Sequence, residues 1–256
     1  MIKIKTENEI ELLRVAGKIT AGALDEISKH IKPGISTLEL DKIAEKYIIN
    51  KGAKPAFLRY EGFPCSICAS IDDVVVHGIP RADCILQEGQ IIGIDVGAKI
   101  NGYCGDAART FAVGKVDESK QKLINVTKEC FFKAIENLKE GSRLGDIGFE
   151  VERCAEKHGF EPVHQMGGHG VGRDMHEDPF VPMFGRAGTG IKLEAGMVLA
   201  IEPMINMGTY EIIVNGWDVR TADGLPSAHY ENTVLITKTG VEILTKTADL
   251  EANNLE

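Results

Sequence analysis

The sequence has few aromatic residues, no long hydrophobic run and no excess of positive charge. Phe, Trp and Tyr make up 6% of the 256 residues, with a single Trp. No apolar stretch approaches the roughly 20 residues of a membrane-spanning helix, and the N-terminal segment lacks the apolar core of a signal peptide. The formal net charge of −9 disfavours nucleic acid or an anionic membrane as the main partner. We therefore expect a cytoplasmic protein with no direct nucleic-acid function and no membrane attachment.

Cysteine is present, but not in a pattern that forms a zinc site by itself. The six cysteines are scattered at positions 65, 68, 84, 104, 130 and 154. Cys65 and Cys68 form a lone Cys-x-x-Cys pair, without a second pair or histidines at matching spacing. We expect six reduced thiols rather than a structural zinc site.

Two aspartates lie in a predicted β-hairpin, where this residue type is uncommon. The segment IIGIDVGAKINGYCGDAART (91–110) contains Asn101-Gly102, which is typical of a two-residue type I′ turn. This turn places Asp95 and Asp106 on a diagonal of the same sheet face. Their neighbours on that face are small: Gly93, Gly97, Cys104 and Ala108. Such a face favours a cation site, and solvated carboxylates on an ordinary exposed sheet are the alternative.

The chain repeats its own pattern at a constant spacing. Capping boxes at Thr6–Glu9 and Ser36–Glu39 begin two predicted helices, which end near His30 and at Gly52. A second pair of helices follows, from about 117 to 140 and up to residue 159. Equivalent residues 107 positions apart are Gly34/Gly141, Glu45/Glu152, Gly52/Gly159, Pro55/Pro162 and Ile94/Ile201. A constant offset across helices, a proline and a strand favours duplication over chance similarity.

The repeat predicts an α+β fold in one domain, residues 1–256. Its two α/β halves, about 1–115 and 116–250, would pack about a pseudo-twofold axis. Asp95 then corresponds to Glu202, and Glu231 is the candidate counterpart of Asp106, displaced by an insertion at 210–227. Four carboxylates in a partly buried site repel one another unless cations compensate them, so the cluster predicts a two-metal site. A mainly oxygen ligand set favours Mn, Fe or Co.

Several histidines lie near these carboxylates. His169, in the glycine-rich segment GGHGVG, is the candidate imidazole ligand. His176 lies in RDMHEDP and His77 in VVVHGIP, where a histidine is more often structural than catalytic. His229 precedes Glu231 by two residues in a predicted strand and shares its face, so it either supports the site or competes as a ligand.

Five motifs occur in the order VVVHGIP, IIGIDVGAKINGYCGDAART, GGHGVG, LAIEPM and SAHYENT. In these motifs and their order the chain resembles the type I methionine aminopeptidases of the pita-bread metallopeptidase family, over essentially its whole length. The resemblance implies a pita-bread fold, with two pseudo-twofold-related halves around a central curved antiparallel sheet. The segment from His169 to Glu202 leaves no room for the helical insertion of type II enzymes.

The resemblance also implies roles for individual residues. The metal ligands would be Asp95, Asp106, His169, Glu202 and Glu231. They would hold two divalent ions, Co, Mn, Fe or Zn, with a metal-bridging water as the nucleophile. Glu202 would act as the general base, His176 would stabilise the oxyanion, and His77 would contact the scissile amide and help the leaving nitrogen.

The resemblance further implies a substrate pocket and a reaction. The pocket for methionine would consist of Tyr60, Phe63, Cys68, Met175 and Trp217, together with His77 and His176. A monovalent cation would bind near Asp72, Val74 and Ser227. The implied activity is removal of N-terminal methionine from nascent proteins, with a small second residue preferred. The implied partners are N-terminal peptides of nascent chains, with the ribosome as one place of action, and the implied state is a monomer.

Two other interpretations compete with this one. A prolidase-like peptidase would use the same ligand order, although the HGIP motif and the short chain favour an aminopeptidase. A binding protein that kept the fold without the metals is the second alternative. All five ligand positions and both histidines, His77 and His176, are present, which argues against it.

Overall fold

The helices begin at the caps that the sequence predicts. The computed structural model describes residues 1–248 and 250, so residues 249 and 251–256 of the predicted domain lie outside the described part. The helices are α1 (Glu7–Ser28), α2 (Thr37–Asn50), η1 (Tyr60–Gly62), α3 (Glu118–Ile135) and α4 (Leu144–Lys157). Both predicted capping boxes are formed. α3 ends earlier than predicted, because Leu138 N–H donates to Ile135 O and closes a turn instead of continuing the helix.

The strands form antiparallel sheets. One sheet contains β1 (Lys54–Pro55), β4 (Ile91–Ile100), β2 (Ile67–Ile71) and β5 (Tyr103–Ala112). Another contains, in order, β15 (Val241–Ile243), β14 (Asn232–Ile236), β9 (Val198–Ile201), β7 (Gly167–Gly170) and β8 (Glu177–Pro182). A third contains β13 (Ser227–His229), β10 (Met204–Asn206) and β6 (Glu161–Pro162). The fourth contains β11 (Ile212–Asn215), β12 (Asp218–Thr221) and β3 (Val74–Val76).

The register predicted for the β4–β5 hairpin is confirmed. Ile100 pairs with Tyr103, and Gly97 pairs with Asp106. Asn101 and Gly102 take φ values of 52° and 84°, as a type I′ turn requires. Asp95 therefore lies on the same face as Asp106.

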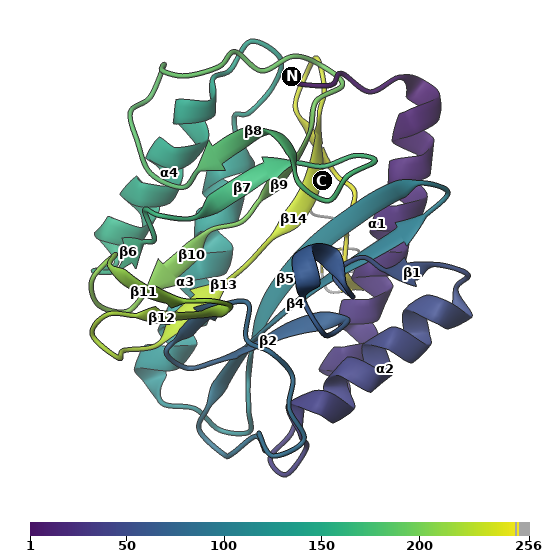
Figure 1. Cartoon of the computed structure of the whole chain (residues 1–256). Coiled ribbons are helices and arrows are strands. Elements are labelled where there is room, and N and C mark those ends of the chain that lie inside the picture. Colours follow the sequence, from purple (N-terminus) through teal and green to yellow (C-terminus); the bar gives the residue numbers. More distant parts are fainter. Residues whose placement is uncertain (249, 251–256) are drawn as a thin grey trace.

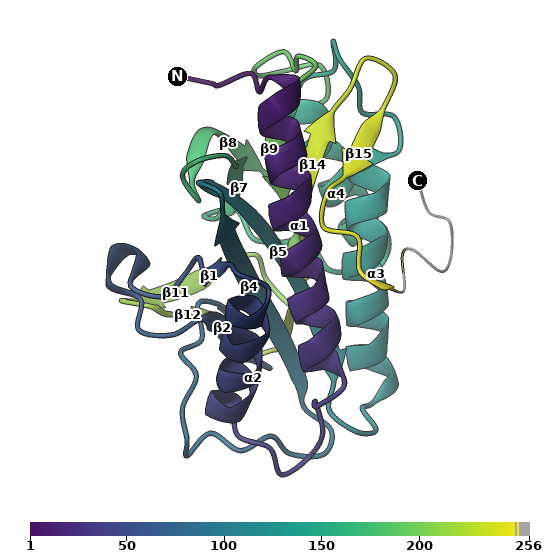
Figure 2. The same ribbon diagram turned by 90° about the vertical axis from the view of Figure 1, so that its right-hand side faces the viewer.

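The helices cover one side of the strands and leave the other side open. Figure 1 and Figure 2 show α1 behind β4 and β5, α2 beside this sheet, and α3 and α4 behind β9 and β14. One apolar core joins α1 and α2 to the first sheet, and a second joins α3 and α4 to the strands of the later half. Among the residues that the structure describes, no helix is long and apolar enough to cross a membrane.

Matched contacts recur in the two parts of the chain. Gly34 N–H donates to Leu86 O at 2.8 Å, and Gly141 N–H donates to Leu193 O at 2.9 Å. Both glycines have φ of 93°. The equivalent isolated bridges are Ser36–Ile85 and Arg143–Lys192. Since every pair keeps the offset of 107, we propose that residues 1–115 and 116–250 are two repeats of one unit within a single domain.

Two threonine hydroxyls join β5 to the strands of the second half. Glu231 N–H donates to Ala108 O at 2.9 Å, the direct backbone bond at this seam. On one side, Thr233 Oγ1 accepts from Asp106 N–H (2.9 Å) and donates to Asp106 O (2.8 Å). On the other side, Thr110 Oγ1 accepts from His229 N–H (2.8 Å) and donates to His229 O (3.0 Å). The threonines therefore fix the backbone of the residues that face the site.

We expect Thr233→Val to destabilise the protein by about 1–3 kcal/mol, because the N–H and C=O of Asp106 lose their partner in a buried seam. Urea unfolding of the metal-free protein measures this. Thr127→Val is the matched control, since its buried hydroxyl only donates to Leu123 O one turn back in α3. Equal losses of unfolding free energy in the two variants would show that the Thr233 bonds to Asp106 stabilise the protein no more than an ordinary hydroxyl bond within a helix.

Candidate metal centre and active site

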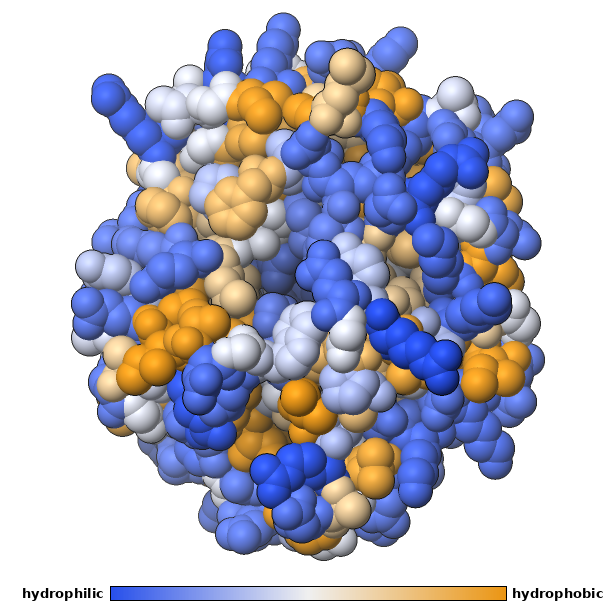
Figure 3. Space-filling view, viewed as in Figure 1, coloured by the Kyte–Doolittle hydropathy of each residue, from blue (hydrophilic) through white to orange (hydrophobic). Residues whose placement is uncertain are grey.

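The predicted ligands meet in one cavity on the open side of the molecule. The cavity has a volume of about 400 Å³ and is lined by residues of both halves. Figure 3 shows the hollow near the centre of this face. Asp95 comes from β4, Asp106 from β5, and His169 from β7. Glu202 follows β9, and Glu231 lies between β13 and β14.

Close backbone packing explains the glycines around His169. A Cβ atom at Gly168 would lie 2.1 Å from Ala200 O, and one at Gly170 would lie 2.2 Å from Asp178 O. β7 therefore approaches β9 and β8 more closely than any side chain would allow. The glycines let the imidazole of His169 point to the carboxylates from a strand in the middle of its sheet.

The ligand atoms lie at distances suited to shared cations. His169 Nε2 is 3.5 Å from Asp106 Oδ2 and 3.7 Å from Glu202 Oε1. Asp106, His169 and Glu231 each offer one ligand atom, and these three atoms lie within 4.8 Å of one another. His169 Nδ1 lies 2.9 Å from Gly170 O, which orients the ring and leaves Nε2 for the cluster.

Several buried oxygen atoms in this cluster have no hydrogen-bond partner within residues 1–248 and 250. These atoms are Asp95 Oδ1, Asp106 Oδ1 and Glu231 Oε1. Buried polar atoms rarely stay unpartnered in native proteins. Carboxylate oxygens and a neutral imidazole are the donors that divalent cations prefer. The residues therefore fit a site for divalent metal ions.

Burial and mutual repulsion hold protons on these carboxyl groups when no cation compensates them. Burial raises the pKa of Asp106 to about 7. Burial is also the main cause that raises the pKa values of Asp95, Glu202 and Glu231 well above their usual range, and repulsion from Asp106 adds to it in all three. Burial lowers the pKa of His169 to about 4, so the imidazole is neutral and able to bind a metal near neutral pH.

His229 joins the same cluster. Its Nε2 is 3.5 Å from Glu202 Oε2 and 3.8 Å from Glu231 Oε2, and the side chain is 4% exposed. Burial lowers the pKa of His229 to about 3. Both expectations for this residue, support of the carboxylates or direct ligation, agree with this position.

His77 and His176 lie at the cavity wall beside the cluster. The rings of His169 and His176 meet edge to face at 4.3 Å between centroids. His176 Nδ1 lies 3.0 Å from the Tyr60 hydroxyl. His77 has a φ of 60° and packs edge-on against the Trp217 ring at 5.6 Å. Burial lowers the pKa of His77 to about 4 and also lowers the pKa of His176.

Most of the expected methionine pocket lines the cavity. Tyr60, Phe63, Cys68 and Trp217 all do so, and the Phe63 and Trp217 rings meet at 5.2 Å. Met175 differs, because it lies behind the wall rather than on it. It is 2% exposed, and its methyl group occupies the space that a Cβ at Gly97 would need. Met175 therefore supports the pocket from the core.

Other lining residues were not predicted. They are Phe57, Glu61, Val76, Gln165, Met166, Phe180 and Met204. Phe180 lies within β8, Glu61 lies within η1 and the others lie in loops or at strand ends, and their place at the cavity follows from tertiary packing. Gln165 and Met166 directly precede GGHGVG, and this adjacency is the one signal that could have indicated them.

Asp72 and Ser227, two of the residues expected near a monovalent cation, are in contact. Ser227 N–H donates to Asp72 O at 2.9 Å. The Asp72 carboxylate accepts from Lys120 Nζ at 2.8 Å and from Ile91 N–H at 3.2 Å. The Lys120 ammonium therefore compensates the charge of the Asp72 carboxylate. The atoms left to bind a monovalent cation here are backbone oxygens.

Antiparallel strands backed by two helix pairs, with carboxylates and a histidine buried where the halves meet, define a metallohydrolase of the pita-bread fold. The family model Metallopeptidase family M24 matches residues 11–238, and the chain belongs to this family. The chain is 52% identical to a methionine aminopeptidase of Clostridium perfringens over 247 residues, 96% of this chain and 99% of the relative. It is 47% identical to methionine aminopeptidase 1 of Bacillus subtilis, over 96% of this chain and all of the relative.

Solved structures agree with this assignment. The methionine aminopeptidase of Rickettsia prowazekii superposes with a TM-score of 0.94 at 44% identity, covering 96% of this chain and 100% of that one. Prolidase from Pyrococcus furiosus has a TM-score of 0.75 at 28% identity, covering 95% of this chain but 65% of that one. The resemblance to methionine aminopeptidases, the pita-bread fold and the expectation of a metal-dependent peptidase are thereby confirmed.

We expect His169→Ala to lose bound metal and turnover together, because it removes an imidazole that faces the carboxylates. His77→Ala should keep its metal and lose mainly rate, because His77 lies outside the carboxylate set. Metal content of both purified variants, measured beside their turnover, tests this division. Equal metal loss in the two would overturn it.

We also expect metal to stabilise the protein more as the pH rises. The folded-state pKa of Asp106, about 7, lies above the unfolded value of about 4. Its protonated form therefore contributes stability that is present below about pH 4 and lost as the pH rises through about 7. A bound cation compensates the ionised carboxylate and so restores the stability that was lost. The difference in Tm between metal-loaded and metal-free protein should therefore increase from about pH 4 to about pH 7. In Glu231→Gln this increase should be smaller. A Tm difference that stays constant with pH would contradict the prediction.

Proposed function

We propose that this protein removes N-terminal methionine from peptides of nascent proteins and prefers a small second residue. The observation that carries the proposal is the junction of a carboxylate–imidazole cluster with an apolar wall in one cavity. The cluster suits divalent ions, and the wall of Phe63, Cys68 and Trp217 suits a thioether side chain. The identity of the relatives over nearly their full length supports the same activity.

Asp95, Asp106, His169, Glu202 and Glu231 would hold two divalent ions, of Co, Mn, Fe or Zn. When bound, such ions supply Lewis-acid polarisation and an activated water at neutral pH. Glu202 has a carboxylate oxygen on either side, one toward His169 and the other toward His229. This position suits it to accept the proton that the nucleophile loses.

Tyr60 would set the tautomer of His176 through the contact between its hydroxyl and Nδ1. If the Tyr60 hydroxyl donates to Nδ1 of His176, the ring carries its proton on Nε2. The neutral ring can then donate that proton as a hydrogen bond to the developing oxyanion. The lowered pKa of His176 keeps the ring neutral, and the edge contact with His169 holds it beside the metal ligands.

His77 would contact the scissile amide and assist the leaving nitrogen. Its ring is held by Trp217, and both residues line the cavity. A wall at this point limits the size of the second substrate residue. Cytoplasmic action on nascent chains, a monomeric state and a monovalent cation held by backbone oxygens near Asp72, Val74 and Ser227 complete the proposal.

The proposed pocket predicts an order of substrates. We expect kcat/KM to be highest for Met-Ala and Met-Gly peptides, lower for norleucine-Ala, lower again for Leu-Ala and lowest for Ala-Ala. Shape in an apolar pocket discriminates by about 1–3 kcal/mol per methylene, roughly 10–200-fold. Met-Leu should be rejected more sharply than norleucine-Ala, because a clash costs more than a lost contact.

Peptides that share one tail make the comparison direct. If Leu-Ala or Met-Leu were cleaved as well as Met-Ala, a broad aminopeptidase would replace the proposal. Cleavage of X-Pro dipeptides in preference to all of these would identify a prolidase-like activity instead. Phe63→Ala is an informative variant, since it should lower discrimination between Met-Ala and Ala-Ala while the metal content stays unchanged.

A further inference from the structure

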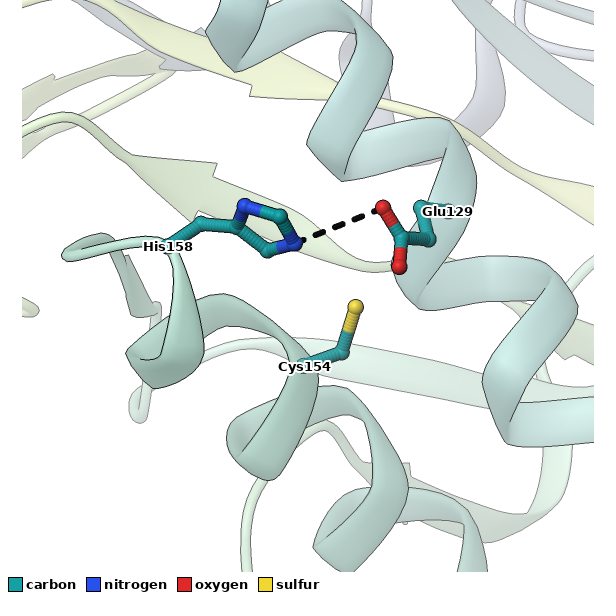
Figure 4. Close-up of side chains that lie close together, drawn as sticks. All are labelled: Glu129, Cys154 and His158. Atoms are coloured by element: carbon teal, nitrogen blue, oxygen red, sulfur yellow. Dashed lines mark ion pairs between the residues drawn. The ribbon is translucent and has the colours of Figure 1, made fainter.

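A second group of metal-binding side chains lies between α3 and α4, outside the cavity. Glu129 belongs to α3, Cys154 to α4, and His158 caps the C-terminus of α4. One ligand atom from each lies within 4.8 Å of the other two. Figure 4 shows the three side chains pointing toward one another across the gap between the helices. None of them lines the catalytic cavity.

The backbone holds these side chains in place. Cys154 and His158 are four residues apart at the end of one helix, so both face the same neighbour. Lys122 Nζ, from α3, donates to the backbone oxygen of His158 at 2.8 Å and ties the end of α4 to α3. Glu129 approaches from α3, with its Oε2 at 3.4 Å from His158 Nε2.

One buried polar atom in this group lacks a hydrogen-bond partner, and a buried thiol faces it. His158 Nε2 is buried and makes no hydrogen bond to any described residue, although the Glu129 carboxylate lies nearby. The Cys154 side chain is 4% exposed and faces the same space. A simple His–Glu ion pair would not involve the Cys154 sulfur that faces the same space. A cation at the centre of the three would be contacted by all of them.

The donor types differ from those of the catalytic centre. A thiolate, an imidazole and a carboxylate are ligands that Zn²⁺ accepts in tetrahedral sites. Cys130 lies next to Cys154, and their thiols share a hydrogen bond that lowers the pKa of Cys154 and raises that of Cys130. Water is available as the fourth ligand, because Glu129 and His158 are partly exposed at the surface.

We propose that Glu129, Cys154 and His158 bind one thiophilic divalent cation, Zn²⁺ by its donor set, as a clamp between α3 and α4. Binding replaces the Cys154 S–H bond with a sulfur–metal bond and releases the proton to solvent. Glu129 and His158 are 40% and 26% exposed at their side chains, so the ion enters from the surface. α3 and α4 share one apolar core with β9 and β14, which flank Glu202 and Glu231. The clamp therefore stabilises the helix layer behind the catalytic strands.

Cobalt(II) added to the metal-free full-length protein separates the two kinds of site. The catalytic ligands are oxygen and nitrogen atoms, whereas a thiolate ligand adds a near-ultraviolet charge-transfer band to Co²⁺. We expect this band to appear, to vanish when Zn²⁺ displaces Co²⁺, and to be lost in Cys154→Ser. Cys68→Ser is the control, because Cys68 is a buried thiol that lines the catalytic cavity. Its band should be unchanged.

Surface variants keep the test valid if Cys154→Ser fails to fold. His158→Ala should weaken Co²⁺ binding at the thiolate site by at least about 10–100-fold, the loss that follows removal of even a supporting residue. Glu129→Gln should weaken it in the same direction. His30→Ala is the matched control, because His30 also pairs with a glutamate near a helix end, with Nε2 at 3.6 Å from Glu26 Oε1. It should leave the band unchanged.

The outcomes that overturn the clamp are definite. Absence of a thiolate band at saturating Co²⁺, or a band that persists in Cys154→Ser, would exclude Cys154 as a ligand. A band lost in Cys68→Ser would place the thiolate in the catalytic cavity instead. Turnover of Met-Ala peptides is a separate readout, so failure of the clamp and failure of the proposed aminopeptidase activity are distinguishable.

Discussion

Burial of four carboxyl groups in one small volume, with their mutual repulsion added to it, is the constraint on which the rest of this structure depends. Asp95, Asp106, Glu202 and Glu231 face one small volume, and without a cation they retain protons, as the pKa of about 7 for Asp106 indicates. Divalent ions supply the missing positive charge. The site therefore couples folding, metal binding and proton release in a single equilibrium.

Such a site requires that two independent sheets hold their ligands at a fixed separation. Where β5 meets the strands of the second half, threonine hydroxyl groups make the contacts in place of a continuous ladder of backbone hydrogen bonds. Thr233 binds both backbone groups of Asp106, and Thr110 binds both of His229, on either side of the bond from Glu231 to Ala108. The glycines beside His169 also allow β7 to approach its neighbouring strands closely. The candidate metal ligands are thus positioned by backbone contacts.

Local patterns and the internal repeat made much of this predictable. The Asn101-Gly102 turn determines the register of the hairpin, and the offset of 107 pairs Asp95 with Glu202. What sequence reasoning missed depends on packing between distant elements. Met175, in the loop between β7 and β8, lies behind the cavity wall because Gly97 on β4 leaves room for it. Similarly, a Cys-x-x-x-His pair near the end of a helix carries no metal signal until α3 brings Glu129 beside it.

The proposed repeat accounts for a pocket that is not symmetric. The candidate metal ligands come from both halves, but the β11–β12 hairpin belongs to an insertion in the second half alone. β12 pairs with β3 of the first half, and the turn between β11 and β12 carries Trp217. The Trp217 ring packs on Phe63 and His77, both from the first half. The insertion thus covers one side of the candidate metal centre. A substrate with an apolar first side chain has one orientation in which Trp217 covers that side chain.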